Sequence, residues 1–387
     1  MPAHSQTESF DVAVIGAGVC GLAVAWRVAQ AGASVVVLDR GAAAPAASRV
    51  AAGMLAPVSE ADPGELELTA LGIDSAARWP AFAGELHAAS GIDPGYRACG
   101  SLLLARDRDE DEALARELAL RERHGLQARR LLPSQARALE PSLAPALRSA
   151  LEVPGDHAVD PRATCAALLR AAELTGVSIR TAPVAARVDL AGDRATGVRT
   201  RGDAPLAAGQ VVVAAGAWSG QDLGLPDAAR VPVRPVKGQT LRLRDPGHRP
   251  GRALLDRVIR FEGGYLVPRG DGRYVLGATV EERGFDTAIT ALGLYELLRD
   301  AAELVPGVLE LEVDEALAGL RPGTPDNAPL LGPSPFVDGL HWATGHHRNG
   351  ILLAPVTGDL VAGALAGTAT IPPAFAAARV AAAQVAA

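Results

Sequence analysis

The chain has 387 residues, of which 49% are hydrophobic and 21% are charged, and its formal net charge at pH 7 is −7. This length exceeds what one simple hydrophobic core usually supports, so two domains are expected, and the ordinary composition excludes wholesale disorder. The negative net charge argues against a nucleic-acid-binding surface, which is normally basic.

The cysteines and the amino terminus indicate the compartment. Cys20, Cys99 and Cys165 lie far apart and form no CxxC pair, so neither a disulfide framework nor a zinc site is expected. The start, MPAHSQTESF, lacks the basic segment and apolar core of a signal peptide. No uncharged apolar run approaches the ~20 residues that span a bilayer. These features predict a cytoplasmic protein with no metal, membrane or nucleic-acid partner.

The first motif in the chain occupies residues 11–40, DVAVIGAGVCGLAVAWRVAQAGASVVVLDR. A β-branched run at 12–15 is followed by a glycine-rich turn at 16–21 and an apolar helical stretch. A second strand is predicted at 34–38, and Asp39 follows it. Strand, turn, helix, strand and acid in this order predict a dinucleotide-binding unit.

Each glycine of this turn has a steric role. Gly16 allows the tight turn, Gly18 lets the backbone approach a pyrophosphate, and Gly21 lets the helix pack on the strand. Asp39 stands where an acid accepts hydrogen bonds from the ribose hydroxyls of FAD or NAD, about 20 residues beyond the turn. An acid rather than an arginine at this position disfavours NADP.

Residues 47–60, ASRVAAGMLAPVSE, form a small-residue segment rather than the next helix of a uniform βαβ repeat. Its glycine and alanines would let backbone amides approach a flat ring closely. On composition alone, a flexible surface loop explains the segment equally well.

The rest of the chain shows two kinds of sequence pattern, one helical and one of short alternating strands. Asp160-Pro161 reads as a helix N-cap before a helix at 162–174, and a charged stretch within 86–144 reads as a solvated helix. Short alternating strands from Val231 onward predict an antiparallel sheet. Further strands are expected at 178–180, 185–190, 196–200, 211–214 and 310–320, with a helix at 292–305. We therefore expect an α/β FAD- or NAD-binding domain at 10–85, 145–228 and 319–375, interleaved with a substrate domain at 86–144 and 229–318.

Five motifs in order, GAGVCG with its strand-end acid, SRVAAGMLAP, YLVPR, GLRPGTPDNAPLLG and GHHRNGILLAP, resemble those of the D-amino-acid-oxidase-like family of FAD-dependent oxidoreductases. The likeness runs from about residue 10 to about 365, and it is strongest to the glycine-oxidase branch associated with thiamine biosynthesis. The first motif is shared by many flavoproteins, whereas the AAGML and GHxRNGILLAP motifs are much more specific. The resemblance implies a Rossmann-like FAD-binding domain with an interleaved antiparallel substrate domain.

The resemblance also implies an activity. Such a protein binds FAD non-covalently and oxidises glycine, sarcosine or D-alanine to an imino acid, with dioxygen reduced to hydrogen peroxide. The imine from glycine would feed thiamine thiazole synthesis, and relatives of this type are commonly homotetramers. Two alternatives stay open: a D-amino-acid dehydrogenase that passes electrons to a quinone, and a non-catalytic flavin-binding subunit.

Three residues are implied to meet the substrate. Arg321 matches the carboxylate-binding arginine of the family, although a surface salt bridge is the ordinary role of an arginine. Tyr265 matches a tyrosine whose hydroxyl contacts the same carboxylate, although sheet packing would also explain it. Arg348 matches a second active-site arginine, or it serves the flavin. Lys237, the only lysine, is expected to be a residue at a strand edge, and Glu60 to be either an entrance residue or a surface acid.

The resemblance places the cofactor against the glycine turn, the small-residue segment, a strand near residue 184 and the carboxy-terminal motif. The implied cofactor-binding residues are Gly16, Ala17, Gly18, Gly21, Asp39, Arg40, Ala47, Ser48, Ala52, Gly53, Met54, Val184, His346, His347, Asn349, Gly350, Ile351 and Leu352.

The two histidines of residues 343–355, ATGHHRNGILLAP, admit a metal site, an acid/base pair or a structural turn. A metal site is disfavoured because no carboxylate or third histidine stands at ligand spacing. The apolar run at 351–365 reads as a helix whose amino-terminal turn can stabilise negative charge on a flavin. His346 and His347 are then expected to be turn residues beside the cofactor.

Overall fold

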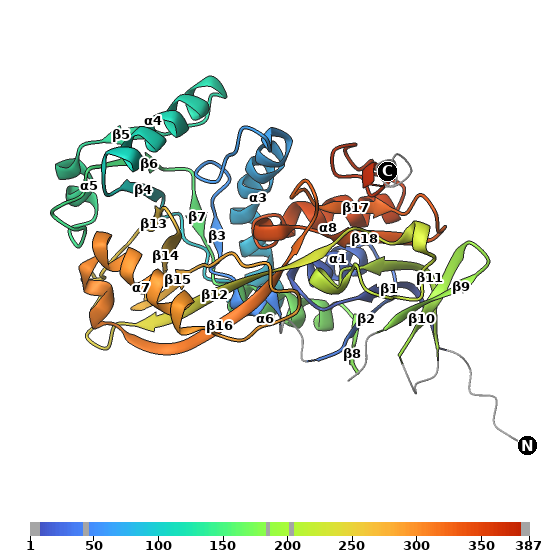
Figure 1. The fold of residues 1–387 in the computed structure, drawn as a ribbon. Coiled ribbons are helices and arrows are strands. Elements are labelled where there is room, and N and C mark those ends of the chain that lie inside the picture. The colour runs from blue at the N-terminus through green and yellow to red at the C-terminus, as the bar shows by residue number, and fades with distance from the viewer. Residues whose placement is uncertain (1–7, 42–45, 183–185, 201–204, 381–387) are drawn as a thin grey trace, which may run out of the picture.

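The computed structural model describes residues 8–41, 46–182, 186–200 and 205–380 (Figure 1). This part of the chain forms two eight-stranded sheets. A third, two-stranded sheet pairs β3 (Met54–Leu55) with β7 (His157–Ala158). The expected combination of a parallel, Rossmann-like sheet with a largely antiparallel second sheet is confirmed.

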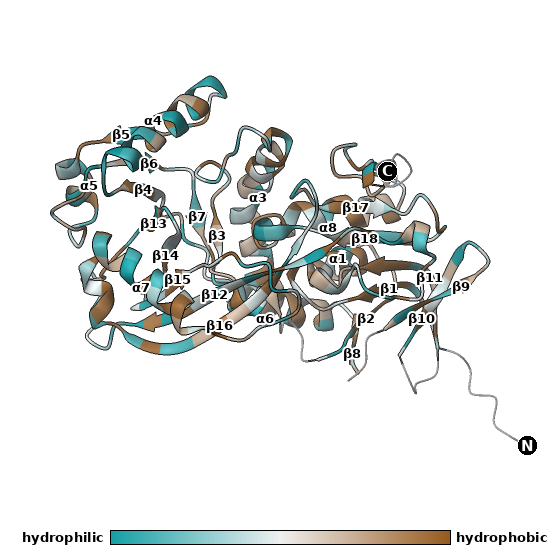
Figure 2. Ribbon diagram, in the orientation of Figure 1, coloured by the Kyte–Doolittle hydropathy of each residue, from teal (hydrophilic) through white to brown (hydrophobic). Residues whose placement is uncertain are grey.

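The first sheet has the strand order β17-β18-β11-β1-β2-β8, with the hairpin β9-β10 attached to β11. All neighbours along this path pair in parallel except β17 and β18. The bounds are β1 Ser9–Ile15, β2 Val35–Asp39, β8 Ser178–Thr181, β9 Arg187–Ala191, β10 Arg194–Arg199, β11 Leu206–Val213, β17 Leu330–Pro333 and β18 Leu340–Thr344. The central strands are apolar on both faces, as Figure 2 shows for β1 and β11, because both faces of the sheet are covered.

Helices from distant parts of the sequence form a layer on one face of this sheet (Figure 1). They are α1 (Val19–Gln30), α3 (Leu66–Ser90), α6 (Pro161–Leu174) and α8 (Ala354–Leu365). Within this layer, α3 packs against α6 and α8. The side chain of Asp160 caps α6 by accepting hydrogen bonds from the backbone of Arg162 and Ala163, as expected. The expected helix at 351–365 starts three residues later, at Ala354, because residues 351–353 form a turn.

The second sheet has the order β16-β12-β15-β14-β13-β4-β6-β5. Every neighbouring pair is antiparallel except β13 with β4. The bounds are β4 Ser101–Ala105, β5 Arg129–Leu131, β6 Ser149–Val153, β12 Arg234–Arg244, β13 Val258–Phe261, β14 Gly264–Pro268, β15 Arg273–Gly277 and β16 Glu312–Gly323. Helices α4 (Arg108–Arg123), α5 (Pro133–Leu139) and α7 (Ala291–Leu304) accompany it, and hydrophilic residues dominate α4 (Figure 2).

Several short elements complete the fold: α2 (Ala47–Val50) and the 3₁₀ turns η1 (Gly216–Trp218), η2 (Asp227–Ala229), η3 (Pro306–Glu310) and η4 (His347–Asn349). The domain boundaries stay a prediction, but β6 belongs to the second sheet although its residues fall in the range expected for the first domain. Within the described ranges, no helix combines the length and the apolar character needed to cross a membrane.

Candidate active site

A cavity of about 560 Å³ extends from the glycine turn after β1 to the face of the second sheet. Its walls come from the carboxyl ends of β1, β2 and β11, from the segment at 46–54, from four strands of the second sheet and from the turn before α8. This volume lies within the roughly 300–1,000 Å³ range of small-molecule sites. The motifs that the resemblance rests on therefore meet around one cavity.

Two glycines of the turn are required by contacts within the protein, and a third is open to a ligand. A Cβ atom on Gly16 would lie 2.4 Å from the carbonyl oxygen of Ala214, and one on Gly21 would lie 2.0 Å from that of Gly16. A Cβ atom on Gly18 would meet only the Ser48 hydroxyl, at 3.5 Å. The backbone at Gly18 is therefore exposed to a ligand, as a pyrophosphate-binding turn requires.

Asp39 stands at the end of β2 beside this turn. Its carboxylate accepts hydrogen bonds from the backbone N–H of Ala17, at 2.7 Å, and of Gly41, at 3.0 Å. Ala17 thus holds the acid in place and does not itself line the cavity, whereas Asp39 does. Because a carboxylate oxygen has more than one acceptor site, Asp39 can still accept a ribose hydroxyl.

The same end of the cavity contains an arginine stacked on an indole, which the sequence did not reveal. The Arg40 guanidinium lies 3.6 Å from the ring centroid of Trp218, and both side chains line the cavity. Trp218 follows β11 in the segment AAGAWS, at the carboxyl edge of the sheet. Position at that edge is the signal that points to Trp218, because ligands of such sheets bind there.

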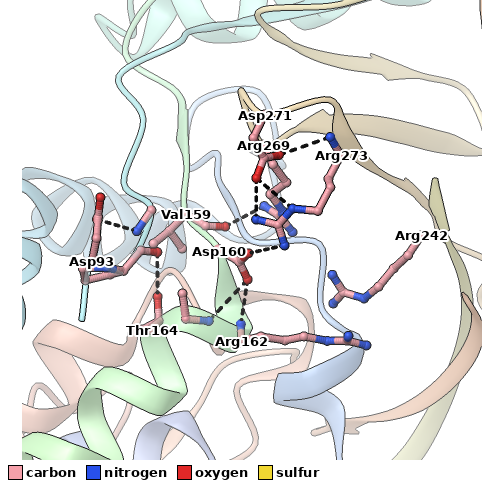
Figure 3. A network of polar contacts seen from close by, with 12 residues as sticks. Asp93, Val159, Asp160, Arg162, Thr164, Arg242, Arg269, Asp271 and Arg273 are labelled. Atoms are coloured by element: carbon pink, nitrogen blue, oxygen red, sulfur yellow. Dashed lines mark hydrogen bonds and ion pairs between the residues drawn. The ribbon is translucent and has the colours of Figure 1, made fainter. Parts of the chain in front are cut away.

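The segment at 47–55 is fixed by a buried arginine rather than flexible. Arg269 donates hydrogen bonds to the carbonyl oxygens of Val159, at 2.7 Å, and Ala52, at 2.6 Å (Figure 3 shows Arg269 and Val159). Burial lowers the pKa of Arg269 to about 10, so the guanidinium is still charged at neutral pH. Gly53 adopts φ +80°, and a Cβ atom there would lie 2.1 Å from the Val159 carbonyl oxygen. Gly53 and its neighbours Ala52 and Met54 therefore form a close, rigid wall of the cavity.

Arg321 on β16 carries a positive charge that has no acid partner among the described residues. Its Nη1 donates to the carbonyl oxygens of Lys237, at 3.2 Å, and Thr279, at 3.1 Å. The guanidinium packs on Gly238, where a Cβ atom would lie 2.4 Å from it. Two backbone carbonyls thus orient the side chain while its charge stays available for a ligand carboxylate.

Tyr265 on β14 lies beside Arg321 in the cavity wall. Burial raises the pKa of its hydroxyl, and the adjacent Arg321 opposes that shift by its charge and by a hydrogen bond. The hydroxyl therefore stays protonated at neutral pH and is a hydrogen-bond donor. Tyr265 and Arg321 together form a site suited to a carboxylate.

Arg348 also lines the cavity, but its charge is already paired. Its Nη2 lies 2.9 Å from a carboxylate oxygen of Glu65, and its Nε lies 3.8 Å from one of Glu60. Glu65 in turn accepts a hydrogen bond from Asn327 at 2.8 Å. Arg348 is held against the wall, so its direct contact with substrate stays a prediction.

The turn before α8 contains two histidines that are neutral at physiological pH. Nε2 of His346 is hydrogen-bonded to the Thr357 hydroxyl at 2.9 Å, and burial lowers the pKa of His346 to about 4. Burial, together with the charges of nearby arginines, also lowers the pKa of His347 to about 4. Neither ring is an acid at neutral pH, and the described part of the chain has no cluster of His, Cys, Asp and Glu suited to a metal ion.

Most predicted site residues line this one cavity. They are Gly16, Gly18, Asp39, Arg40, Ala47, Ser48, Ala52, Gly53, Met54, Tyr265, Arg321, His346, His347, Arg348, Gly350 and Ile351. Four other predicted cofactor-binding residues do not line the cavity: Ala17, Gly21, Asn349 and Leu352. Val184 lies outside the described residues. The Leu352 carbonyl oxygen accepts hydrogen bonds from the Ser75 hydroxyl, at 2.6 Å, and from the Trp79 indole N–H, at 2.9 Å, both on α3. Gly238, Thr240 and Arg260 are lining residues that the sequence did not indicate.

The depressed pKa of His346 predicts a pH-dependent stability. Because the pKa in the folded protein, about 4, lies below the unfolded value of about 6.5, the stabilisation is complete above pH 6.5. It is lost as the pH falls from about 6.5 towards 4. Between pH 7.5 and 5.0, the free energy of unfolding should therefore fall more for the parent protein than for His346→Gln, by on the order of 1–2 kcal/mol.

Urea denaturation at both pH values measures this difference. His87, which is exposed on α3, is the matched control, and His87→Gln should keep the parental pH dependence. Equal pH dependence of the parent and His346→Gln would contradict the assignment of a buried, neutral His346.

Comparison with known proteins agrees with this geometry. The profile of the family described as FAD dependent oxidoreductase matches residues 11–364. Glycine oxidase of Geobacillus kaustophilus is 36% identical over 92% of this chain and 93% of its own, and its crystal structure superposes with a TM-score of 0.85 over 94% of this chain and 96% of that chain. The bifunctional protein ThiO/ThiG of Trichormus variabilis is 35% identical over 91% of this chain and 52% of its own. The structure of iminodiacetate oxidase from Chelativorans sp. BNC1 is 31% identical, with a TM-score of 0.84 over 94% of this chain and 98% of that chain.

The chain belongs to the family of FAD-dependent oxidoreductases, and its cofactor is FAD. Within that family its relatives include the glycine oxidases, as the sequence motifs predicted. The open backbone at Gly18, the acid at the end of β2 and the fixed segment at 47–55 fit this cofactor.

Proposed function

We propose that the protein is an oxidase of glycine and similar small amino acids that uses FAD and dioxygen. The observation that carries this proposal is the pairing of Arg321 and Tyr265 in the wall of the same cavity that begins at the glycine turn. One end of the cavity then receives the dinucleotide, and the other end offers a cation and a hydroxyl to a carboxylate. The glycine-oxidase relatives support the assignment of substrate.

In this proposal the chain mainly orients the substrate. Arg321 and Tyr265 hold the carboxylate, which fixes the direction of the α-carbon. Bound FAD would supply the redox chemistry, as acceptor of the hydride from the carbon that these two residues orient. The neutral rings of His346 and His347 and the apolar wall at 50–54 limit water at this point. Because Arg321 is oriented by backbone carbonyls, its position is fixed before the substrate arrives.

A spectroscopic and peroxide assay tests the proposal. The purified protein should show the visible spectrum of an oxidised flavin, and glycine, sarcosine or D-alanine should bleach it without air and yield hydrogen peroxide in air. Bleaching without peroxide would favour the alternative of a dehydrogenase that delivers electrons to a quinone. A flavin that none of the three substrates bleaches would favour a non-catalytic flavin-binding subunit.

The relationship to the bifunctional protein ThiO/ThiG supports a proposed role in thiamine biosynthesis. In that role, the imine formed from glycine would be consumed in assembling the thiazole ring. A strain that lacks the gene should then require thiamine or its thiazole for growth, and complementation by an Arg321→Met variant should fail.

A further inference from the structure

A third arginine lies close to Tyr265 and is not explained by the binding of glycine. Arg260 on β13 is the cross-strand partner of Tyr265 on β14, and both side chains line the cavity. The Arg260 side chain is three-quarters buried, with 25% of its surface exposed. We use the name substrate end of the cavity for the part lined by Glu60, Arg260, Tyr265, Arg321 and Arg348.

The guanidinium of Arg260 is only partly satisfied by the protein. Its Nη1 donates to the carbonyl oxygen of Ser59, while Nη2 lies 3.7 Å from a carboxylate oxygen of Glu60, beyond hydrogen-bond distance. Its Nε is buried and has no hydrogen-bond partner in the described part of the chain. Nε has almost no exposed surface, so the exposed quarter of the side chain, which lines the cavity, is the part that a ligand oxygen can reach.

The charges around the substrate end favour a substrate with net negative charge. Three guanidinium groups face two carboxylates, Glu60 and the Glu65 that pairs with Arg348, so one positive charge remains. Glycine is a zwitterion with no net charge and would leave that excess in place. An amino acid with a second carboxylate has a net charge of about −1 at neutral pH and would neutralise it.

Next to Arg260, the wall of the cavity includes two glycines. Gly263, in the turn between β13 and β14, and Gly264, the first residue of β14, line the same part of the cavity. A Cβ atom on Gly264 would lie 2.8 Å from the carbonyl oxygen of Gly277, and one on Gly263 would lie 3.3 Å from the Asp300 carboxylate, so this part of the wall consists of backbone and leaves Arg260 as its charged side chain.

We propose that Arg260 is a specificity-determining residue that binds a second anionic group of the substrate, so that amino dicarboxylates are preferred to neutral counterparts of similar size. This inference rests on the proposed amino-acid oxidase function. With iminodiacetate, oxidation of one C–N bond and hydrolysis of the imine give a balanced reaction: iminodiacetate, dioxygen and water yield glycine, glyoxylate and hydrogen peroxide. The second carboxylate stays intact and is the group that Arg260 holds.

Paired substrates test the proposal in steady-state kinetics. Iminodiacetate is compared with sarcosine, which differs by the carboxylate on the nitrogen substituent, and D-aspartate with D-alanine, which differs by the carboxylate on the α-substituent. At least one diacid should exceed its neutral counterpart in kcat/KM by about tenfold or more. In Arg260→Gln that preference should fall by about tenfold or more, because kcat/KM for the diacids should fall by a larger factor than kcat/KM for glycine and sarcosine.

Two further variants distinguish the effect of removing the Arg260 charge from a general effect of mutation on the fold. Arg260→Lys keeps the positive charge and should retain part of the preference. Arg299→Gln removes an exposed arginine of α7 that pairs with Asp300, and it should leave all five substrates unaffected. A parent enzyme that prefers the neutral member of both pairs would overturn the proposal, as would an Arg260→Gln variant that slows all five substrates equally.

A binding experiment decides the proposal even if none of the substrates is oxidised, an outcome that would refute the proposed function. Calorimetric titration of the FAD-loaded protein compares acetate with malonate, which has a second carboxylate. Malonate should bind the parent more tightly, and Arg260→Gln should weaken malonate by about tenfold without weakening acetate. Equal affinity of the parent for the two anions would overturn the assignment of Arg260.

Discussion

Replacing Arg321 with methionine is expected to lower kcat/KM for glycine by about 10²–10³-fold, because truncating one partner of a buried charge pair costs roughly 2–5 kcal/mol. Methionine keeps much of the length and apolar volume of the side chain but has no charge and no donor. The substrate carboxylate would then lose its cation, and the carbonyl oxygens of Lys237 and Thr279 would lose a hydrogen bond. Because Arg321 lies on the second sheet and the glycine turn belongs to the first, FAD should stay bound.

Kinetics and inhibitor binding together measure this effect. The visible spectrum reports retained FAD, and the dissociation constant of glycolate, which offers a carboxylate without an amine, should rise in parallel with the loss of kcat/KM. Arg321→Lys should recover part of the affinity, because it restores the charge but not the two-pronged geometry. An unchanged dissociation constant for glycolate in Arg321→Met would place the carboxylate elsewhere.

The glycine turn was predictable because its physical causes are local. The β-branched run, the three glycines and the following apolar helix lie within about one βαβ unit, so each element constrains the next. The order of elements is as that pattern indicates, although β1 begins at Ser9, before the β-branched run, and α1 begins at Val19, within the glycine turn. The same holds for α6, whose cap at Asp160 and proline at the first turn are adjacent in the sequence.

The long helix α3 was not predicted, and its composition explains why. Small and polar residues and an internal proline, Pro80, interrupt its apolar face. Its buried side chains nevertheless recur at helical spacing, at Leu68, Leu71, Trp79, Phe82 and Leu86, and the helix packs against α6 and α8. Reading those apolar positions at intervals of three and four would have revealed the helix.

Some residues of the site were not predicted from the sequence for a different reason. The register of the second sheet is what brings them together. Arg260 meets Tyr265 only because β13 pairs with β14, and Gly238 meets Arg321 because β12 pairs with β16. The β12–β16 pairing joins distant parts of the chain, and the β13–β14 hairpin is local, but in both cases the register that brings the side chains together cannot be read from either strand alone.

The expectation that Lys237 lies at a strand edge was wrong for the same reason. β12 runs between β15 and β16, and residues near Glu281 fold back to pair with Lys237. The side chain is fully buried, with its ammonium nitrogen 3.2 Å from a carboxylate oxygen of Glu281. Its backbone carbonyl meanwhile orients Arg321, so the residue supports the site without lining the cavity.

Replacing Gly18 with alanine is expected to weaken FAD binding by about tenfold or more while the protein keeps its fold. Gly18 has φ −72°, which alanine adopts without strain, and the new Cβ atom would meet only the Ser48 hydroxyl, at 3.5 Å. The protein therefore tolerates the methyl group, and a loss of FAD must come from its contact with the pyrophosphate. Gly21→Ala should behave differently, because its Cβ atom would lie 2.0 Å from a backbone oxygen and would destabilise the apoprotein as well.

Fluorescence titration of the apoproteins with FAD, together with their thermal unfolding, distinguishes these two effects. Gly84→Ala on α3 is the control, because no atom outside its own helix backbone and chain neighbours lies within 4 Å of the added Cβ atom. That variant should match the parent in both measurements. Gly18→Ala should change only the titration, because its side chain projects into the space that FAD fills. If Gly18→Ala binds FAD as tightly as the parent does, the pyrophosphate does not approach this turn, and the orientation of the dinucleotide in the cavity must be reversed or displaced.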